Sequence, residues 1–403
     1  MNQPIICKEL ESGYDINLVS GTLSHCCKFE YIPPNQEEID SLGYKYLDFN
    51  KETMLARQEL AQGIQTKRCK DCWNYENKNQ PSWRIQQNTI PRDYKKNVHL
   101  NLQISSLCNQ SCFYCVPDLS SSINKFDSWI NPGTALLSKV EQKKTKIAFD
   151  FNHIIDFVKN LPKDTEHFDL SLTGGEPFIV DKFNENIKYI FKSFFATHPN
   201  QSATLNISTN TNIDVENLFS FYEMINILKE KYRLRMIITS SVENLEERAE
   251  YVRGGLVWSN FLENFKIHNT NADGHEIRMT INPFTIVNIS DFFKYFSDYP
   301  KIHFLYNYPF QKFWRLESMD NRFDKELIKL EDYVIKTNFE HKFFPDPWYK
   351  TLNQFMLDDK KNAQLFKQAI TGIDEVRKTN WRNVFPEYID WIDSIKSNVN
   401  DRN

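Results

Sequence analysis

The sequence has few glycines, no long apolar run and no excess of charge of one sign. Only 11 of its 403 residues are glycine, so adjacent glycines mark places where the main chain needs unusual freedom. No stretch approaches the roughly 18 consecutive apolar residues of a membrane-spanning helix. The first residues, M-N-Q-P-I-I-C-K-E-L-E-S, lack the basic segment and apolar core of an export signal. We therefore expect a cytoplasmic protein without a membrane partner.

Net charge and chain length further restrict the class of protein that the sequence can encode. With 49 basic and 53 acidic residues the formal charge is -4, which argues against a broad basic surface for nucleic acid, although not against a local patch. At 403 residues the chain is long enough for two or three domains around a large core. Eight cysteines in a long chain with no export signal indicate metal binding rather than disulfides.

Three of these cysteines stand together in the run C-N-Q-S-C-F-Y-C, as Cys108, Cys112 and Cys115. Iron-sulfur clusters usually take four cysteine ligands, so a C-x3-C-x2-C loop can hold three irons and leave the fourth open to another ligand. Structural zinc is the alternative, although zinc sites are usually built from two C-x2-C pairs. A second run, T-G-G-E-P-F at 173–178, follows a strand-like segment at 168–172.

Taken together, the cysteine run and the G-G-E-P turn resemble the radical S-adenosylmethionine (SAM) superfamily. The resemblance implies a [4Fe–4S] cluster on the three cysteines, with SAM chelating the open iron. It also implies that Tyr114 packs near the adenine and that the turn, Gly174, Gly175, Glu176 and Pro177, binds the methionine amino group. Glycine suits this task because it lets the main chain approach a ligand. For Glu176 the alternative is an ordinary surface carboxylate.

Strand-like and helix-like segments alternate from about residue 98 to 309, which predicts a parallel sheet with functional residues at the carboxyl ends of its strands. The cysteine run and the G-G-E-P turn both stand at such ends. The α/β fold class that we expect is a partial (βα)6 TIM-like barrel, as in radical SAM enzymes. The expected strands are 99–105, 168–174, 204–210, 235–240, 277–283 and 301–309.

Polar residues after the later strands are further candidates for SAM contacts. Ser208 and Asn210 stand at the end of the third strand, Ser240 ends the fourth and Glu243 follows it, and Arg253 stands in Y-V-R-G-G. Hydroxyl and carboxylate groups can bond ribose or the methionine part of SAM, and the resemblance places an arginine such as Arg253 near the SAM carboxylate, where a guanidinium binds bidentately. Helix capping is the alternative for the Ser and Asn residues.

The other five cysteines lie in the first 95 residues. Cys7, the Cys26-Cys27 doublet and the C-x2-C pair Cys69 and Cys72 resemble the segment that binds an auxiliary [4Fe–4S] cluster in SPASM and twitch radical SAM enzymes. In many of those enzymes this segment follows the barrel, whereas here it precedes it. We assign Cys7, Cys26, Cys69 and Cys72 as ligands and keep Cys27 as a reserve ligand in place of Cys26, with a free thiol as the alternative for Cys27. Four-cysteine zinc is the alternative.

These patterns predict an irregular auxiliary-cluster segment at 1–95, a radical SAM partial barrel at 96–310 and a C-terminal helical extension at 311–403. The stretch 374–389 resembles the C-terminal helix and loop of twitch-type proteins, and we assign no chemistry to it. The resemblance implies reductive cleavage of SAM to a 5'-deoxyadenosyl radical, with electrons from a donor such as flavodoxin or ferredoxin. The expected substrate is a peptide or protein, and the alternative substrate is a small polar metabolite (sugar, aminocyclitol or nucleotide). A second alternative for the protein as a whole is a non-catalytic iron-sulfur redox or scaffold protein.

Overall fold

A computed structural model describes residues 4–89, 93, 96–117, 119–126, 150–309, 311–316, 324–337 and 360–395. The described chain divides into two compact units. The first draws on Met1–Ser105, Gln142–Ile207 and Glu216–Met236, and the second on Ser106–Glu141, Ser208–Val215 and Ile237–Asn403. The three predicted domain ranges stay predictions. Within the described residues, no helix is both long and apolar enough to cross a membrane.

The sheet of the first unit runs in the strand order β6-β5-β3-β1-β2. All of its neighbours pair in parallel except β1 and β2, which are antiparallel. Side chains of β5 alternate, with Phe168, Leu170 and Leu172 fully buried, as expected of a strand with one face on the core. The strands are β1 (Gly13–Asn17), β2 (Thr22–Ser24), β3 (Asn97–Ser105), β5 (His167–Gly174) and β6 (Ser202–Thr209).

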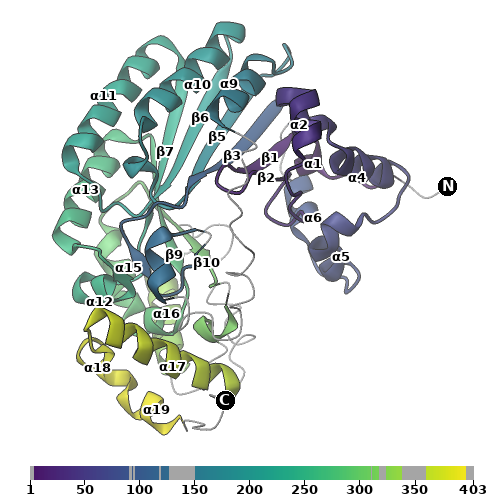
Figure 1. The fold of residues 1–403 in the computed structure, drawn as a ribbon. Coiled ribbons are helices and arrows are strands. Elements are labelled where there is room, and N and C mark those ends of the chain that lie inside the picture. The colour runs from purple at the N-terminus through teal and green to yellow at the C-terminus, as the bar shows by residue number, and fades with distance from the viewer. Residues whose placement is uncertain are drawn as a thin grey trace. The chain divides into compact units, whose positions relative to one another are not determined.

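Helices α9, α10 and α11 cover one face of this sheet (Figure 1). In α10, apolar residues recur every three or four positions and are buried, which is the pattern of a helix packed by one face. Asp150 begins α9 with a capping box to His153. The helices of the first unit are α1 (Lys8–Ser12), α2 (Gln36–Leu42), α3 (Tyr46–Phe49), α4 (Lys51–Ala61), α5 (Lys70–Glu76), α6 (Trp83–Thr89), α9 (Phe151–Lys159), α10 (Phe183–Thr197) and α11 (Val215–Lys231), with short 3-10 turns η1 (Gly43–Lys45), η2 (Lys67–Cys69) and η4 (Pro177–Ile179).

The second unit contains the later part of β7 (Arg233–Ser241), from Ile237 on, and the strands β9 (Gly274–Thr280) and β10 (Ile302–Asn307), which pair in parallel in that order. It also contains the antiparallel pair β4 (Ser111–Cys112) and β8 (Arg253–Gly254). Its core is rich in aromatic rings, including Phe113 against Trp314 with centroids 4.6 Å apart. Its helices are α12 (Glu246–Val252), α13 (Trp258–Asn271), α14 (Pro283–Ile286), α15 (Ile289–Ser297), α16 (Asp324–Thr337), α17 (Lys360–Arg377), α18 (Trp381–Val384) and α19 (Ile389–Ser394), with 3-10 turns η3 (Ser121–Phe126), η5 (Lys312–Trp314) and η10 (Pro386–Tyr388).

The predicted α/β class is confirmed. Strands β3, β5, β6, β7, β9 and β10 form where the alternating segments predict them, in the strand-helix order of the predicted partial (βα)6 barrel. The N-terminal segment is more regular than we expected, because β1 adds to the sheet beside β3. The predicted C-terminal helical extension is present in α16, α17, α18 and α19, within the described part of that region.

Candidate functional site

The cysteine run lies in the second unit, directly after the end of β3. Cys112 is buried in β4, where it pairs with Arg253 of β8. Cys108 and Cys115 are half-buried on either side of it. Burial raises the pKa of Cys112 to about 11 and raises that of Cys115 further. Both thiols are therefore neutral in the bare protein, and a bound metal would have to displace their protons.

A buried network joins Arg253, Glu243, Tyr114 and Cys112. Arg253 Nη2 donates to Glu243 Oε2 at 2.6 Å, and its Nη1 lies 3.7 Å from Cys112 Sγ. The Tyr114 hydroxyl donates to Glu243 Oε1 at 2.8 Å, and its ring lies 5.7 Å from the Arg253 guanidinium carbon. Burial by itself would lower the pKa of Arg253, but the Glu243 carboxylate raises it above its ordinary value. Three predicted SAM contacts thus meet beside one predicted ligand.

The other polar candidates of this unit fall into different surroundings. Asn210 lies against the cysteine run, with Nδ2 2.6 Å from Asn109 Oδ1 and 3.9 Å from Cys108 Sγ. Ser208 accepts a hydrogen bond from Arg278 Nη1 at 3.2 Å. The hydroxyl of Ser240 is fully buried between Thr211 and His275. Of the three, only Asn210 is brought to the cysteines; the roles proposed for all of them stay predictions.

The G-G-E-P turn ends β5 in the first unit. Gly174 has φ +121°, and a Cβ atom on it would collide with the carbonyl oxygen of Ser105, so this position requires glycine. Gly175 N donates to that same carbonyl at 2.8 Å. Glu176 is buried and accepts from Phe178 N at 3.2 Å, which caps the short turn that begins with Pro177. The turn is thereby held against the end of β3.

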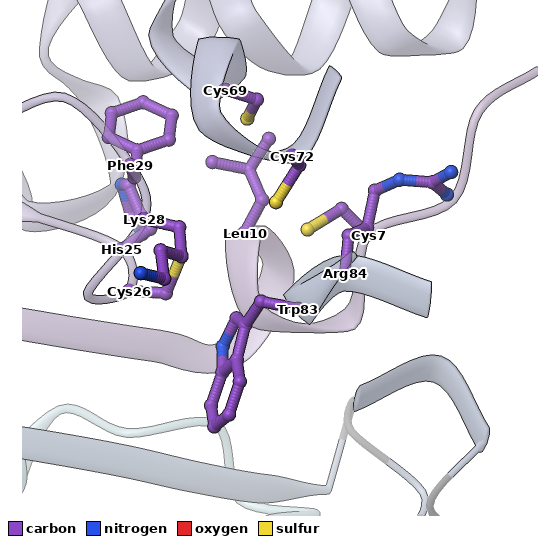
Figure 2. Close-up of a pocket in the computed structure, with 10 residues that line it drawn as sticks. All are labelled: Cys7, Leu10, His25, Cys26, Lys28, Phe29, Cys69, Cys72, Trp83 and Arg84. Carbon is purple, nitrogen blue, oxygen red and sulfur yellow. The ribbon is translucent and has the colours of Figure 1, made fainter. Parts of the chain in front are cut away.

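The N-terminal cysteines form a second candidate site, within the first unit. Cys7, Cys26, Cys69 and Cys72, the four predicted ligands, line one cavity, whereas Cys27 is exposed and does not line it. In Figure 2 the sulfurs of Cys7 and Cys72 point toward each other, and the Leu10 side chain lies between them and Cys26. The four side chains come from separate elements, because Cys7 precedes α1, Cys26 follows β2, Cys69 ends η2 and Cys72 lies in α5.

An arginine completes the lining of this cavity. Arg84 donates through Nη2 to Glu76 Oε2 at 2.5 Å and through Nη1 to the Ile6 carbonyl at 2.7 Å. Its guanidinium carbon also lies 5.3 Å from the ring of Trp73. Ser82 donates to the other Glu76 oxygen at 2.5 Å. These bonds fix the positively charged guanidinium of Arg84 at the wall of the cavity that the four cysteines line.

The donor set of the cavity fits a thiolate-bound metal group. Burial raises the pKa of Cys7 to about 11 and raises the pKa of Cys26 and Cys69 further. Enclosed thiols of this kind suit a group that displaces their protons and supplies positive charge. Among the described residues, no group of three or more His, Cys, Asp or Glu side chains is arranged to hold a metal ion. The fit therefore lies in donor type and enclosure, not in preformed coordination.

Comparison with known proteins adds a likeness in structure alone. No protein-family model matches the sequence, and no curated protein matches it. Among solved structures, native anSMEcpe with bound AdoMet matches with a TM-score of 0.43 and 15% identity, over 65% of this chain and 63% of that one. The same protein with AdoMet and a Kp18Cys peptide matches with a TM-score of 0.42 and 14% identity, over 65% of this chain and 62% of that one. TYW1 with a lysine-pyruvate adduct matches with a TM-score of 0.32 and 16% identity, over 59% of this chain and 73% of that one.

These matches are partial. The chain spans less than two thirds of the length of the anSMEcpe structures that it resembles. At such TM-scores and identities, the likeness does not assign a function.

Proposed function

We propose that this protein is a radical SAM enzyme that carries an auxiliary [4Fe–4S] cluster in its N-terminal cavity. One observation carries the proposal. Strands β3 and β5 are parallel neighbours, and their carboxyl ends lead into the cysteine run and the G-G-E-P turn. The hydrogen bond from Gly175 N to the Ser105 carbonyl ties the turn to the end of β3, three positions before Cys108. Ligand sites of parallel sheets form at such ends.

The roles of the residues follow from the chemistry of the group they would hold. Cys108, Cys112 and Cys115 are the proposed ligands of a [4Fe–4S] cluster with SAM on its open iron. With one electron from a donor, a cluster and SAM bound there would supply methionine and a 5'-deoxyadenosyl radical, which would take a hydrogen atom from a substrate carbon to give 5'-deoxyadenosine. Arg253, which Glu243 holds beside Cys112, is the proposed partner of the SAM carboxylate.

The turn and the remaining polar residues complete the proposed SAM site. Its glycines expose main-chain groups to the methionine amino group, since a side chain there would block the approach. Tyr114 is the proposed adenine contact, and Asn210 is placed to fix the cysteine run through Asn109.

The N-terminal cavity has a different proposed role. Because four cysteines line it, a [4Fe–4S] cluster there would have all its irons ligated by protein. Electron transfer from the substrate radical, or bracing of the fold, is then favoured over direct binding of substrate. We further propose a peptide or protein substrate and an electron donor such as flavodoxin or ferredoxin.

Metal analysis of anaerobically purified protein tests the two sites separately. We expect about eight irons per chain and formation of 5'-deoxyadenosine from SAM under reduction. Cys112→Ala should abolish this formation and keep the auxiliary iron, whereas Cys69→Ala should lose the auxiliary iron and keep SAM cleavage. Cys27→Ala is the matched control, because that thiol is exposed and outside the cavity, and it should keep all the iron.

Three results would count against the assignments. Parent-rate formation of 5'-deoxyadenosine by Cys112→Ala would remove the radical SAM proposal. Four irons with one zinc would retain the first cluster and remove the second. Deuterium transfer into 5'-deoxyadenosine from a labelled sugar, aminocyclitol or nucleotide, and not from labelled peptides, would replace the peptide substrate.

A further inference from the structure

The last residue of α17, Arg377, is half-buried and lies against the short strands β4, which contains Cys112, and β8. Its Nη1 donates to the Tyr251 carbonyl at 2.7 Å, and its Nη2 donates to the Ser111 carbonyl. Ser111 directly precedes Cys112 in β4, and Tyr251 lies two positions before Arg253 of β8. One guanidinium therefore joins the main chain of the cysteine run to the segment that carries the arginine beside Cys112.

Two glycines of β8 and its end make room for this arrangement. A Cβ atom on Gly254 would lie 2.6 Å from the guanidinium carbon of Arg377. Gly255 has φ +96°, and a Cβ atom there would lie 2.8 Å from the carbonyl oxygen of Asn109, inside the cysteine run. The glycine pair thus fits between the guanidinium and the main chain of the run, where any side chain would force them apart.

The end of α17 is itself fixed. Asp374, one turn earlier in the helix, accepts from Trp381 N at 2.8 Å and from the Thr379 hydroxyl at 2.6 Å. Because these bonds join residue 374 to residues 379 and 381, they close the segment that contains residue 377 and fix the end of the helix where the guanidinium meets the two carbonyls. A planar guanidinium donates along several fixed directions, which a lysine ammonium cannot reproduce.

We propose that Arg377 is a positioning residue of the cysteine run, so that the C-terminal helix forms part of the cluster site. The proposal rests on the proposed function. Arg377 binds the Ser111 carbonyl, next to Cys112, and thereby places both a fixed contact and a positive charge at the main chain of the cysteine run. Removal of a residue that orients a metal ligand typically weakens metal retention by about 10- to 100-fold. Loss of the nearby positive charge also lowers the reduction potential of a cluster.

The test uses the full chain, purified and reconstituted without oxygen. Its readouts are the rate of iron loss to a chelator and the reduction potential of the cluster whose electron paramagnetic resonance signal changes when SAM is added. Arg377→Gln should lose the iron of that cluster about 10- to 100-fold faster than the parent and show a more negative potential. Arg377→Lys should keep the potential close to the parent value and still lose iron faster, since one ammonium cannot hold both carbonyls.

Two variants serve as comparisons. Arg382→Gln is the matched control, because Arg382 belongs to the same C-terminal region but forms an exposed ion pair with Asp393. It should match the parent in both readouts. Gly254→Ala should resemble Arg377→Gln in iron loss, because it displaces the guanidinium without removing its charge.

The outcomes separate this inference from the proposed function. If the parent binds no iron, or yields no 5'-deoxyadenosine, the proposed function fails. If the parent does both and Arg377→Gln matches it, the positioning role alone is overturned. Should Arg377→Gln lose its secondary structure by circular dichroism, Arg377→Lys decides, and parent-like iron loss in that variant would also overturn the role. Equal iron loss in Arg382→Gln would assign the effect to general destabilisation instead.

Discussion

The ion pair between Arg253 and Glu243 is a strong test of the site's energetics, because it needs no cofactor. The two side chains are only 5% and 1% exposed and lie 2.6 Å apart. In such surroundings the removal of one partner leaves the other as an uncompensated buried charge, which typically costs about 3–5 kcal/mol. Glu243→Gln keeps the shape of the side chain and an acceptor for Tyr114, so we expect the free energy of unfolding to fall by about that amount.

A double-mutant cycle isolates the pair. Arg253→Met fills a similar volume without charge, and Glu243→Gln combined with Arg253→Met should be more stable than the sum of the single losses predicts, by about 1–3 kcal/mol. The control is the ion pair between Arg382 and Asp393, whose side chains are 44% and 47% exposed. Asp393→Asn should change the free energy of unfolding by only about 0–1 kcal/mol.

The assay is urea unfolding at pH 7, followed by far-ultraviolet circular dichroism, on iron-free protein and again after reconstitution. Equal slopes of free energy against urea in all variants would show that the change lies in the stability and not in the unfolded state. A loss below about 1 kcal/mol in Glu243→Gln, or losses that simply add in the double variant, would refute the view of a desolvated and mutually dependent pair.

Three more predictions concern the first unit. Burial lowers the pKa of His25 to about 4, so the contribution of the neutral imidazole to the free energy of unfolding is complete above pH 6.5 and is lost as the pH falls toward 4. The full contribution is on the order of 3 kcal/mol. Urea unfolding at pH 7 and at pH 5 should therefore show a smaller loss of stability between the two pH values in His25→Asn than in the parent. Gly174→Ala should destabilise more than Gly43→Ala, because both have positive φ but only the first Cβ would meet main chain; equal losses by thermal unfolding would contradict this. Arg84→Gln should reduce auxiliary iron and leave 5'-deoxyadenosine formation intact, as measured by metal analysis beside product assay, and unchanged iron would make the arginine a purely structural residue.

The parts of the fold that follow from local pattern were predictable. The alternation of Phe168, Leu170 and Leu172 indicates β5, and their burial confirms it. Strand β1 gave no such signal, since G-Y-D-I-N is short and half polar. It becomes a strand through pairing with β3, 86 positions later, and a pairing of this kind depends on tertiary contacts that periodicity does not encode.

The candidate site shows the same division. The spacing within each cysteine run and the glycines of the turn could be recognised because their chemistry is local. The partner of each side chain could not be recognised, because it lies far away in the sequence: Arg253 contacts Cys112, 141 positions earlier, and Arg377 contacts Ser111, 266 positions earlier. The position of Ser240 at the end of the fourth predicted strand suggested a ligand contact, but its hydroxyl lies in a buried hydrogen-bond network with His275. Sequence identifies the chemistry of these groups, and packing decides what they touch.

Each cysteine site has a paired arginine beside it, and the pairing has a consequence for metal binding. Burial raises the pKa of Cys7 and of Cys112, so these thiols carry no charge, and an arginine that faced them alone would be an uncompensated cation. Glu243 balances Arg253, and Glu76 balances Arg84. The carboxylates therefore let the guanidiniums stay in place before any metal arrives. When thiolates form around a metal group, the site gains negative charge and the positive charge that offsets it is already oriented, so little of the binding free energy is spent on reorganising the protein.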